Sequence, residues 1–445
     1  MRIDLAFGKT GLSANLPDGF NYQVLEARSA RPLDNPALAL ELGMDSPIGC
    51  VPITELARGK KTAAISVCDI TRPAPNKQVL PPLLKRLEAA GIPRDGVTIL
   101  IATGLHRPAT DAEILEIVGA EIAAAYRIVN HHAKVLSEHT YLGDTSTGTP
   151  VHIDTRFIEA DLHITLGFIE PHLMLGYSGG RKLIAPGLAA QETIKVLHSP
   201  KFMRDSRAVE SSITDNPLHR ELLEISAMAR HDFMIDVALT RDRRIAGVYA
   251  GKAVEAHAKG VEFVSKVMLE TLDEPVDAVI TTCAGYPLDL TFYQAVKGVT
   301  AASHIVKHGG KILIVAECAE GPGAPEFCEM IKRFSSDTAF LDHVKDSPVV
   351  VDQWQLEKLA LVTTRKKLLF FTPGMPAEYH PHLWGPSFGS IEDAVAALTA
   401  DLKPGARVAV IPEGPYVLAK VSERTEQPLP YGHGSERTTS IRTAP

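Results

Sequence analysis

The sequence predicts an α/β protein made of two Rossmann-like domains, each with a mostly parallel sheet. Two observations lead to this fold class. Short apolar runs alternate with amphipathic helical stretches in the first part of the chain, and the same alternation starts again after about residue 272. In addition, a chain of 445 residues is too long for one compact core and suggests two or three domains.

The first domain is expected to alternate strands with helices. Strands are predicted at 61–68, 95–104 and 161–170, and helices at 79–92 and 111–129. Thr110 and Glu113 have the spacing of a capping box, which marks the start of the second helix. Such a β-α-β order favours a parallel sheet with helices on both faces.

The same pattern continues in the second domain. The segment 251–272 predicts one long helix that connects the domains. After it we expect a strand at 276–283, a helix from about Thr291, and strands at 309–318 and 407–414. The predicted division is an N-terminal domain over 1–272, a C-terminal domain over 273–420 and a polar tail over 421–445.

The composition excludes several classes of protein. Apolar residues make up 45% of the chain and charged residues 22%, an ordinary globular mixture. The net charge of −7 gives no global reason to bind nucleic acid or an anionic membrane. No run approaches the roughly 18 apolar residues of a membrane helix, and the N-terminus lacks a signal-peptide core. The five scattered cysteines fit a reducing compartment, so we expect a cytoplasmic protein without membrane or nucleic-acid partners.

In open α/β sheets, ligands bind beyond the carboxyl ends of the strands. Applied to the expected strands, this rule selects the loops 68–73, 102–108, 167–183 and 281–298. The same four loops are unusually rich in Gly, His, Arg and Lys. Most of the candidate functional residues come from them.

The first two loops offer an anion-binding group and a candidate base. Arg72 has a planar guanidinium that suits a carboxylate or phosphate, and Asp69 is close enough in sequence to orient it. The alternative is a structural Asp–Arg pair that braces the turn before Pro73. His106 lies between Gly104 and a helix, where the helix dipole favours the neutral ring that a general base needs. An ordinary surface histidine is the alternative there.

The segment 170–182 is the richest in functional groups. Its glycines, with Ser178, Arg181 and Lys182 before a helical stretch, form a suitable cradle for a nucleotide phosphate. The order of residues matches neither a Walker A loop nor G-x-G-x-x-G. A buried lysine has a lowered pKa and can bond to carbonyl-type carbons, which makes Lys182 a candidate for covalent chemistry. A glycine-rich surface turn is the alternative.

A metal ligand and a second-domain wall complete the candidates. His198 ends a predicted helix and is either a ligand for a metal such as nickel or an exposed histidine. No H-E-x-x-H motif accompanies it, so a conventional zinc site is not indicated. Tyr293 and Gln294 share a helix face with Lys297 and can contact one ligand. Thr291 and Gln294 also fit a capping box, which leaves Gln294 either functional or structural.

Taken in order, these motifs resemble the nickel-pincer nucleotide-dependent lactate racemase family. The resemblance runs through 69–73, 104–107, 170–182, His198 and 293–297, and covers about residues 1 to 415. It implies an isomerase, a racemase or epimerase of a 2-hydroxy acid, with its active site in the cleft between the domains. It also implies a cofactor, a pyridinium mononucleotide whose two sulfur-bearing substituents hold nickel through sulfur, carbon and sulfur.

The resemblance assigns roles to the matching residues. Lys182 matches the lysine that binds the cofactor covalently, and His198 matches the protein ligand of nickel. His106 and His172 match the paired acid–base histidines. The N-terminal domain therefore becomes the expected cofactor-binding domain. The other matching cofactor positions are Asp69, Thr71, Ser178, Gly179, Gly180 and Arg181.

The chemistry of a 2-hydroxy acid explains these residue types. Its α-hydrogen is a poor proton donor, so its removal as hydride needs an electron sink, which no side chain supplies. One histidine takes the hydroxyl proton during hydride transfer to the cofactor, and a histidine returns the proton once the 2-oxo acid has turned. The resemblance places the substrate carboxylate on Arg72 and Lys297, with Tyr293 and Gln294 in the second-domain wall.

Other functions fit part of the pattern. A divalent-metal hydrolase or lyase would use the same histidines, and a non-enzymatic nickel or cofactor carrier would need only Lys182 and His198. A nicotinamide dehydrogenase is disfavoured because its glycine fingerprint is absent. Within the family, lactate, malate, aryl-lactates and sugar acids are all open as substrates. Because other proteins must make the cofactor, cofactor-biosynthesis proteins are expected partners.

Overall fold

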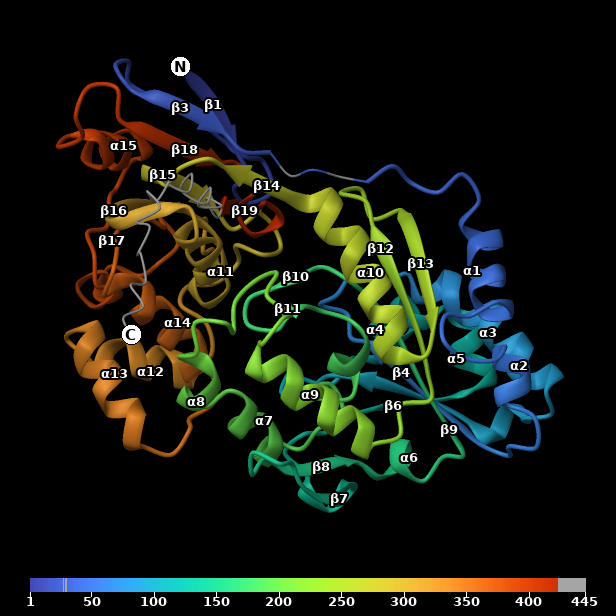
Figure 1. Ribbon diagram of the computed structural model, residues 1–445. Coiled ribbons are helices and arrows are strands. Elements are labelled where there is room, and N and C mark those ends of the chain that lie inside the picture. Colours follow the sequence, from blue (N-terminus) through green and yellow to red (C-terminus); the bar gives the residue numbers. More distant parts are fainter. Residues whose placement is uncertain (27, 29, 423–445) are drawn as a thin grey trace, which may run out of the picture.

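The computed structural model describes residues 1–26, 28 and 30–422, which form an α/β protein of two domains (Figure 1). The predicted fold class is confirmed, because each domain has its own mostly parallel sheet. The tail expected at 421–445 lies, from residue 423 on, outside the described residues. None of the helices in the described part has the length and apolar character needed to cross a membrane.

The first domain is built on a six-stranded sheet. The order across it is β13 (Ile245–Gly251), β12 (Phe233–Leu239), β9 (Leu162–Phe168), β4 (Ala63–Cys68), β5 (Val97–Ala102) and β6 (Arg127–Asn130). All neighbouring strands are parallel except β12 and β13. Every residue of β4 and β9 is buried, as expected for central strands that are covered on both faces.

Two layers cover this sheet. One contains α1 (Pro36–Asp45), α2 (Ile53–Leu56), α3 (Asn76–Ala89), α4 (Asp111–Val118) and α5 (Ala120–Ala125). The other contains β7 (His139–Asp144), β8 (Pro150–Asp154), α6 (Thr155–Ile158), α7 (Gln191–Leu197), α8 (Pro200–Met203) and α9 (Pro217–Met228). After β9 the chain forms β10 (Pro171–His172), β11 (Gly176–Tyr177) and the 3-10 turn η3 (Gly180–Leu183). The helix α10 (Ala253–Met268) packs against β12 and β13.

The second domain has a five-stranded parallel sheet. Its order is β17 (Lys367–Phe371), β16 (Val306–Val315), β15 (Val276–Thr282), β18 (Arg407–Ile411) and β3 (Asn21–Val24). One face packs against α11 (Phe292–Ser303), α12 (Pro325–Arg333), α13 (Asp337–Asp346) and α14 (Gln353–Thr363). The other packs against α15 (Ile391–Thr399) and the hairpin of β1 (Arg2–Leu5) and β2 (Leu12–Asn15).

The chain's first residues depart from the predicted division. Residues 1–25 belong to the second domain, because β3 pairs with β18 and Leu5 and Leu16 lie in the core of that domain. These short, half-exposed strands carry little hydrophobic periodicity, so their sequence alone does not reveal their partner. The division near residue 272 stays a prediction.

Two predicted helices are also shorter than expected. The helix predicted over 111–129 is interrupted at Gly119, whose φ of +89° ends α4, and its last residues form β6. The connecting helix ends at Met268, and β14 (Leu269–Leu272) follows it and pairs with β19 (Leu418–Val421). The capping box of Thr110 and Glu113 is confirmed. The hydrophobic periodicity of these segments did not reveal that the last residues of each predicted helix form a strand that pairs with a distant one.

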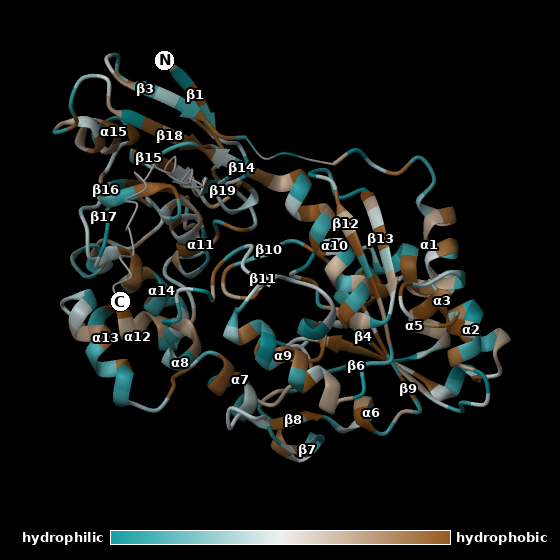
Figure 2. Ribbon diagram, viewed as in Figure 1, coloured by the Kyte–Doolittle hydropathy of each residue, from teal (hydrophilic) through white to brown (hydrophobic). Residues whose placement is uncertain are grey.

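The strand order places the functional loops. In the first sheet the chain winds outward in both directions from the boundary between β4 and β9. In the second sheet it winds outward from β15 to β17 and then returns to the other side of β15 as β18, while β3, from the start of the chain, forms the edge beyond β18. Ligands in doubly wound sheets bind at such switch points, beyond the carboxyl ends of the strands. Figure 2 shows apolar residues on the central strands β4 and β9, whereas α9 and α10 carry polar residues on part of their surface. Packing in the core therefore holds the strands in place, and the polar loops that follow them can form a ligand-binding site.

Candidate functional site

A cavity of about 660 Å³ lies between the two domains, at the carboxyl ends of the central strands. The first domain contributes the loops after β4, β5 and β9 together with the end of α7. The second domain contributes α11 and the start of α14. Residues far apart in sequence thus meet around one space, which is large enough for a nucleotide-sized ligand.

The loop after β4 holds a histidine of the next loop. Nδ1 of His106 lies 2.7 Å from Oδ2 of Asp69, and the hydroxyl of Thr71 donates to Oδ1 of Asp69 at 2.7 Å. Burial acts to raise the pKa of Asp69, but the hydrogen bond and charge of His106 outweigh it and lower that pKa. Because a carboxylate only accepts, Nδ1 of His106 carries a proton, and the neutral tautomer of this ring has its lone pair on Nε2.

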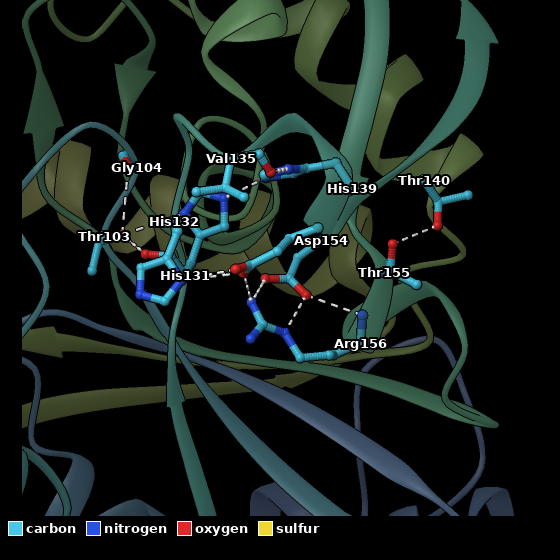
Figure 3. Close-up of polar contacts among 11 residues, drawn as sticks. Thr103, Gly104, His131, His132, Val135, His139, Thr140, Asp154, Thr155 and Arg156 are labelled. Carbon is cyan, nitrogen blue, oxygen red and sulfur yellow. Dashed lines mark hydrogen bonds and ion pairs between the residues drawn. The ribbon is translucent and has the colours of Figure 1, made fainter.

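A chain of neutral groups supports the turn before His106 (Figure 3). Nδ1 of His139 donates to the carbonyl of Val135 at 2.9 Å, so Nε2 of His139 accepts from Nε2 of His131, also at 2.9 Å. Burial lowers the pKa of both rings, that of His131 to about 3. The hydroxyl of Thr103 donates to the His131 carbonyl at 2.8 Å, and the backbone N–H of His106 donates to the Thr103 carbonyl at 2.9 Å. Buried hydrogen bonds therefore anchor the turn that presents His106.

His172 lines the same cavity and has the opposite tautomer. Its Nδ1 accepts long hydrogen bonds from the backbone N–H groups of Met174 and Leu175, each at 3.4 Å. Burial and the charges of Lys182, Arg72 and Lys297 hold the pKa of His172 well below its usual value. The ring is therefore neutral, with its proton on Nε2. One cavity histidine presents an acceptor and the other presents a donor.

The turn before Lys182 is shaped by two glycines and a buried carboxylate. Gly179 and Gly180 have φ of +86° and +46°, which favour glycine. A Cβ on Gly179 would lie 2.2 Å from Oδ2 of Asp236. That same oxygen accepts the backbone N–H of Gly180 at 2.7 Å, while Ser178 donates its hydroxyl to the Phe168 carbonyl at 2.9 Å. Burial raises the pKa of Asp236 to about 7.

Three cationic side chains gather around the cavity. Burial and, to a smaller extent, the charge of Arg72 lower the pKa of Lys182 to about 7. Burial and Arg72 also lower the pKa of Lys297, to about 8. The carboxyl of Glu170 interacts electrostatically with all three cations, and burial raises its pKa against their influence. The expected hydrogen bond between Asp69 and Arg72 does not form, since the guanidinium contacts only the Thr71 carbonyl, at 3.5 Å.

His198, at the end of α7, has the tautomer of a metal ligand. Its Nδ1 lies 2.8 Å from the carbonyl of Ile194, which only accepts, so Nδ1 carries the proton and Nε2 is free. Burial lowers the pKa of His198 to about 4, so the ring is neutral. Its centroid lies 4.5 Å from that of the Trp354 ring.

The second-domain wall is a hydrogen-bonded cluster. The indole N–H of Trp354 donates to the hydroxyl of Tyr293 at 3.1 Å, and Asp352 interacts with the same hydroxyl. Burial and the charge of Asp352 raise the pKa of Tyr293. The capping box expected from Thr291 and Gln294 is not formed, because no side chain caps α11. Instead Gln294 lines the cavity, and its buried Oε1 has no hydrogen-bond partner.

Most of the expected site residues share this cavity. Those that line it are Asp69, Arg72, His106, His172, Ser178, Gly179, Lys182, His198, Tyr293, Gln294 and Lys297. Thr71, Gly180 and Arg181 do not line it. Thr71 and Gly180 act instead on Asp69 and Asp236 through the hydrogen bonds given above. Arg181 points away and donates to the carbonyls of Leu175 and Tyr177, at 3.2 and 3.0 Å.

The sequence reasoning missed three residues that shape the cavity. Trp354 and Asp352 lie on or beside α14, and Asp236 lies on β12. None belongs to a loop selected by the strand-end rule. The only available signal for Trp354 was its rarity, since the chain has two tryptophans.

Comparisons with known proteins agree with this arrangement. The lactate racemase N-terminal domain family matches residues 7–211, and the lactate racemase C-terminal domain family matches residues 272–419. A lactate racemase from Thermoanaerobacterium thermosaccharolyticum is 31% identical over 423 residues, with 94% of this chain and 99% of the relative covered. A lactate racemase from Lactiplantibacillus plantarum is 33% identical over 425 residues, with the same coverage of 94% and 99%.

Solved structures are similar as well. The lactate racemase apoprotein from Thermoanaerobacterium thermosaccharolyticum superposes with a TM-score of 0.88 at 31% identity, covering 95% of this chain and all of the other. A protein from Thermotoga maritima superposes with a TM-score of 0.66 at 17% identity over 88% of this chain, which shows a common fold.

Proposed function

Because the chain belongs to the lactate racemase family, we propose that it racemises or epimerises a 2-hydroxy acid, such as lactate, with a nickel-pincer nucleotide. The observation that carries this proposal is the pair of histidines in the cavity. His106 presents a lone pair on Nε2 and His172 presents an N–H, beside the cations Arg72 and Lys297. Inversion of a 2-hydroxy acid needs an acid and a base, together with a group that holds the carboxylate.

The residues of the cavity fit the proposed cofactor. Lys182 has a pKa lowered to about 7, so much of it is a neutral nucleophile near neutral pH. His198 has a free Nε2 and donates its other ring N–H to a carbonyl, as metal-binding histidines do. The described residues contain no group of three His, Cys, Asp or Glu side chains that could hold a metal. A metal on His198 would thus need donors from a cofactor, and the nickel-pincer nucleotide would supply them and the hydride acceptor.

The chain's own residues have distinct tasks in this proposal. Nε2 of His106 accepts the proton of the substrate hydroxyl, and Asp69 stabilises the resulting imidazolium. Nε2–H of His172 donates a proton to the substrate oxygen as the 2-hydroxy acid is re-formed with inverted configuration. Arg72 and Lys297 hold the carboxylate while the 2-oxo acid turns, and the two domains shield it from water.

The test is loading and turnover of the full chain after co-expression with cofactor-biosynthesis proteins. We expect an adduct of nucleotide size on Lys182 and about one nickel per chain, measured by intact mass and metal analysis. Lys182→Ala should lose the adduct, whereas Lys134→Ala, which changes an exposed lysine at the same cavity, should keep it. Chiral chromatography with single enantiomers of lactate, malate and phenyllactate then identifies the substrate.

The outcomes separate the alternatives. A normal adduct in Lys182→Ala, or a wild-type chain without adduct or nickel, would rule out the proposed cofactor. A loaded chain that inverts none of a broad set of 2-hydroxy acids would favour the cofactor carrier.

The five cysteines carry no disulfide in the structure, which supports the proposed cytoplasmic location.

A further inference from the structure

A second cavity, of about 400 Å³, lies between α9 and α10, behind the turn that carries Lys182. We call it the rear groove. Its buried end contains Arg181 of η3, His219 of α9 and His257 of α10, which are 3%, 8% and 5% exposed. Its open end contains Ala258 and Val254, which are exposed. It shares no lining residue with the interdomain cavity.

Several polar atoms at the buried end of the rear groove lack hydrogen-bond partners. Nε of Arg181 and Nδ1 of His219 are buried and have no hydrogen-bond partner. Nε2 of His257 lies 2.8 Å from Nη1 of Arg181 and 2.7 Å from the carbonyl of Ser178. A neutral ring nitrogen serves only one of these neighbours, since it either accepts or donates. Buried polar atoms without partners are unfavourable, and a ligand with acceptor atoms would satisfy them.

The buried end also carries an uncompensated positive charge. Within the described part of the chain, the guanidinium of Arg181 bonds to three backbone carbonyls and to Nε2 of His257 but to no carboxylate. Burial lowers its pKa to about 9. Asp236 is the acidic group that influences it, but burial raises the pKa of Asp236 to about 7, so near neutral pH it is only partly ionised. Burial of an unpaired guanidinium is costly, and a bound anion would reduce that cost.

Above these groups the groove is apolar. Ile213, Leu223 and Val261 line its walls, and Ser226 adds one hydroxyl. Glu262 lies at the open end, where Lys259 and Lys266 pair with it and counter its charge. The shape and chemistry suit a molecule with an acidic head and an apolar tail.

We propose that the rear groove binds a small monocarboxylate with an apolar chain, its carboxylate against Arg181 and His219. This site is separate from the one that holds the proposed substrate and does not depend on the proposed function. Arg181 also donates to the carbonyls of Leu175, Tyr177 and Gly179, which belong to the turn before Lys182. A ligand in the rear groove thus contacts that turn from the side opposite to the cavity.

The test is binding of hexanoate to the full chain without cofactor, by isothermal titration calorimetry. The neutral analogue 1-hexanol and the cation hexylammonium are the matched probes. We expect hexanoate to bind at least about tenfold more tightly than 1-hexanol, because its carboxylate forms charge-assisted hydrogen bonds. Hexylammonium should not bind. Ala258→Phe should block binding by filling the open end, whereas Ala227→Phe, at an exposed position on α9 outside the lining, should not.

The interdomain cavity also attracts carboxylates, so the two sites must be separated. Arg72→Met with Lys297→Met should leave hexanoate binding unchanged if it occurs in the rear groove. His219→Phe keeps a ring of similar size without nitrogen and should weaken binding several-fold. Equal affinity for hexanoate and 1-hexanol would overturn the proposed carboxylate site. So would binding that survives Ala258→Phe but is lost in the Arg72 and Lys297 double variant.

Discussion

At the residue scale, the two cavity lysines give a prediction on pH. The pKa of Lys182 is lowered to about 7 and that of Lys297 to about 8, so their neutral amines are populated above those values. Exposed lysines titrate near 10.4. We therefore expect trinitrobenzenesulfonate to modify Lys182 and then Lys297 with rates half-maximal near pH 7 and pH 8. Peptide mass mapping after short exposures measures each rate.

Neighbouring charges supply the control for this prediction. Arg72 lowers the pKa of Lys182 and Glu170 raises it. Arg72→Met should therefore move the modification midpoint of Lys182 upward, and Glu170→Gln should move it downward. Shifts in the same direction in both variants would show that electrostatics does not govern this lysine.

The hydroxyl of Tyr293 is expected to fix the second-domain wall. Tyr293→Phe keeps the ring but leaves the indole N–H of Trp354 without its acceptor. We expect a loss of about 1–3 kcal/mol in the free energy of unfolding, measured in urea. Tyr141→Phe removes an exposed hydroxyl that bonds Asp144, and its effect should stay within about 0.5 kcal/mol. Equal losses in the two variants would contradict the proposed role of Tyr293.

The residue scale also shows what sequence reasoning can find. The strand-end rule selected the loops of His106, His172 and Lys182, because the chain must place polar residues where parallel strands end. The residue types of 170–182 and the family resemblance assigned Arg181 to the cofactor cradle, yet after the two left-handed glycines this side chain points to the opposite side. The strand-end rule found nothing at Asp236, because a lone acidic residue within an apolar strand has no local signature.

At the element scale, the turn before Lys182 depends on glycine. Gly179→Ala would place a Cβ 2.2 Å from the Asp236 carboxylate at a φ of +86°, so the turn must shift. Gly148 has a similar φ of +88° and no atom within 4 Å of such a Cβ. Gly148→Ala therefore isolates the backbone strain, which costs about 1–2 kcal/mol. We expect Gly179→Ala to lower thermal stability further and to abolish fast modification of Lys182. A loss equal to that of Gly148→Ala would mean that the contact with Asp236 is relieved.

Elements were predicted well where they are self-contained. Strands β4, β5, β9 and β15 match their expected ranges closely, because an apolar run between turn signals describes a buried strand fully. The errors lie where an element depends on a distant partner. β14 pairs with β19, and β3 pairs with β18. Neither pairing can be predicted from the local sequence. Gly119 is a residue type that often ends a helix, but the hydrophobic pattern of a helix continues on both sides of it.

At the scale of the whole molecule, buried polar contacts join the domains. Nζ of Lys358 on α14 donates to the carbonyls of Met203 and Ala208, each at 3.0 Å. Glu357 pairs with Arg204 at 2.6 Å. The carboxylate of Glu210 contacts α11, on which Tyr293, Gln294 and Lys297 lie. Docking of the domains therefore sets where the second-domain wall stands relative to His106 and Lys182.

Glu210 is the contact through which pH should act on this docking. Its carboxylate lies 2.6 Å from Nε2 of His304 and 3.3 Å from the Thr300 hydroxyl. Burial acts to raise the pKa of Glu210, but His304 outweighs it and lowers that pKa. A carboxyl with a lowered folded pKa stabilises the folded state above its unfolded value, about 4.3, and that contribution is lost as pH falls through the folded pKa. Because intrinsic amide exchange itself slows as the pH falls, the quantity to measure is the protection factor of each α11 amide, and these factors should decrease as the pH falls below about 4.

Glu210→Gln removes the charge while keeping the shape. At pH 7 we expect lower protection factors in α11, a substrate KM raised several-fold with a smaller change in kcat, and no further loss of protection below pH 4. Asp242→Asn, which removes an exposed pair with Arg244 within the first domain, should change none of these. Unchanged exchange in Glu210→Gln would assign the docking to Lys358 and Glu357 instead. In that case α11 would be positioned by its neighbour α14, and Lys358→Met should produce the changes expected here for Glu210.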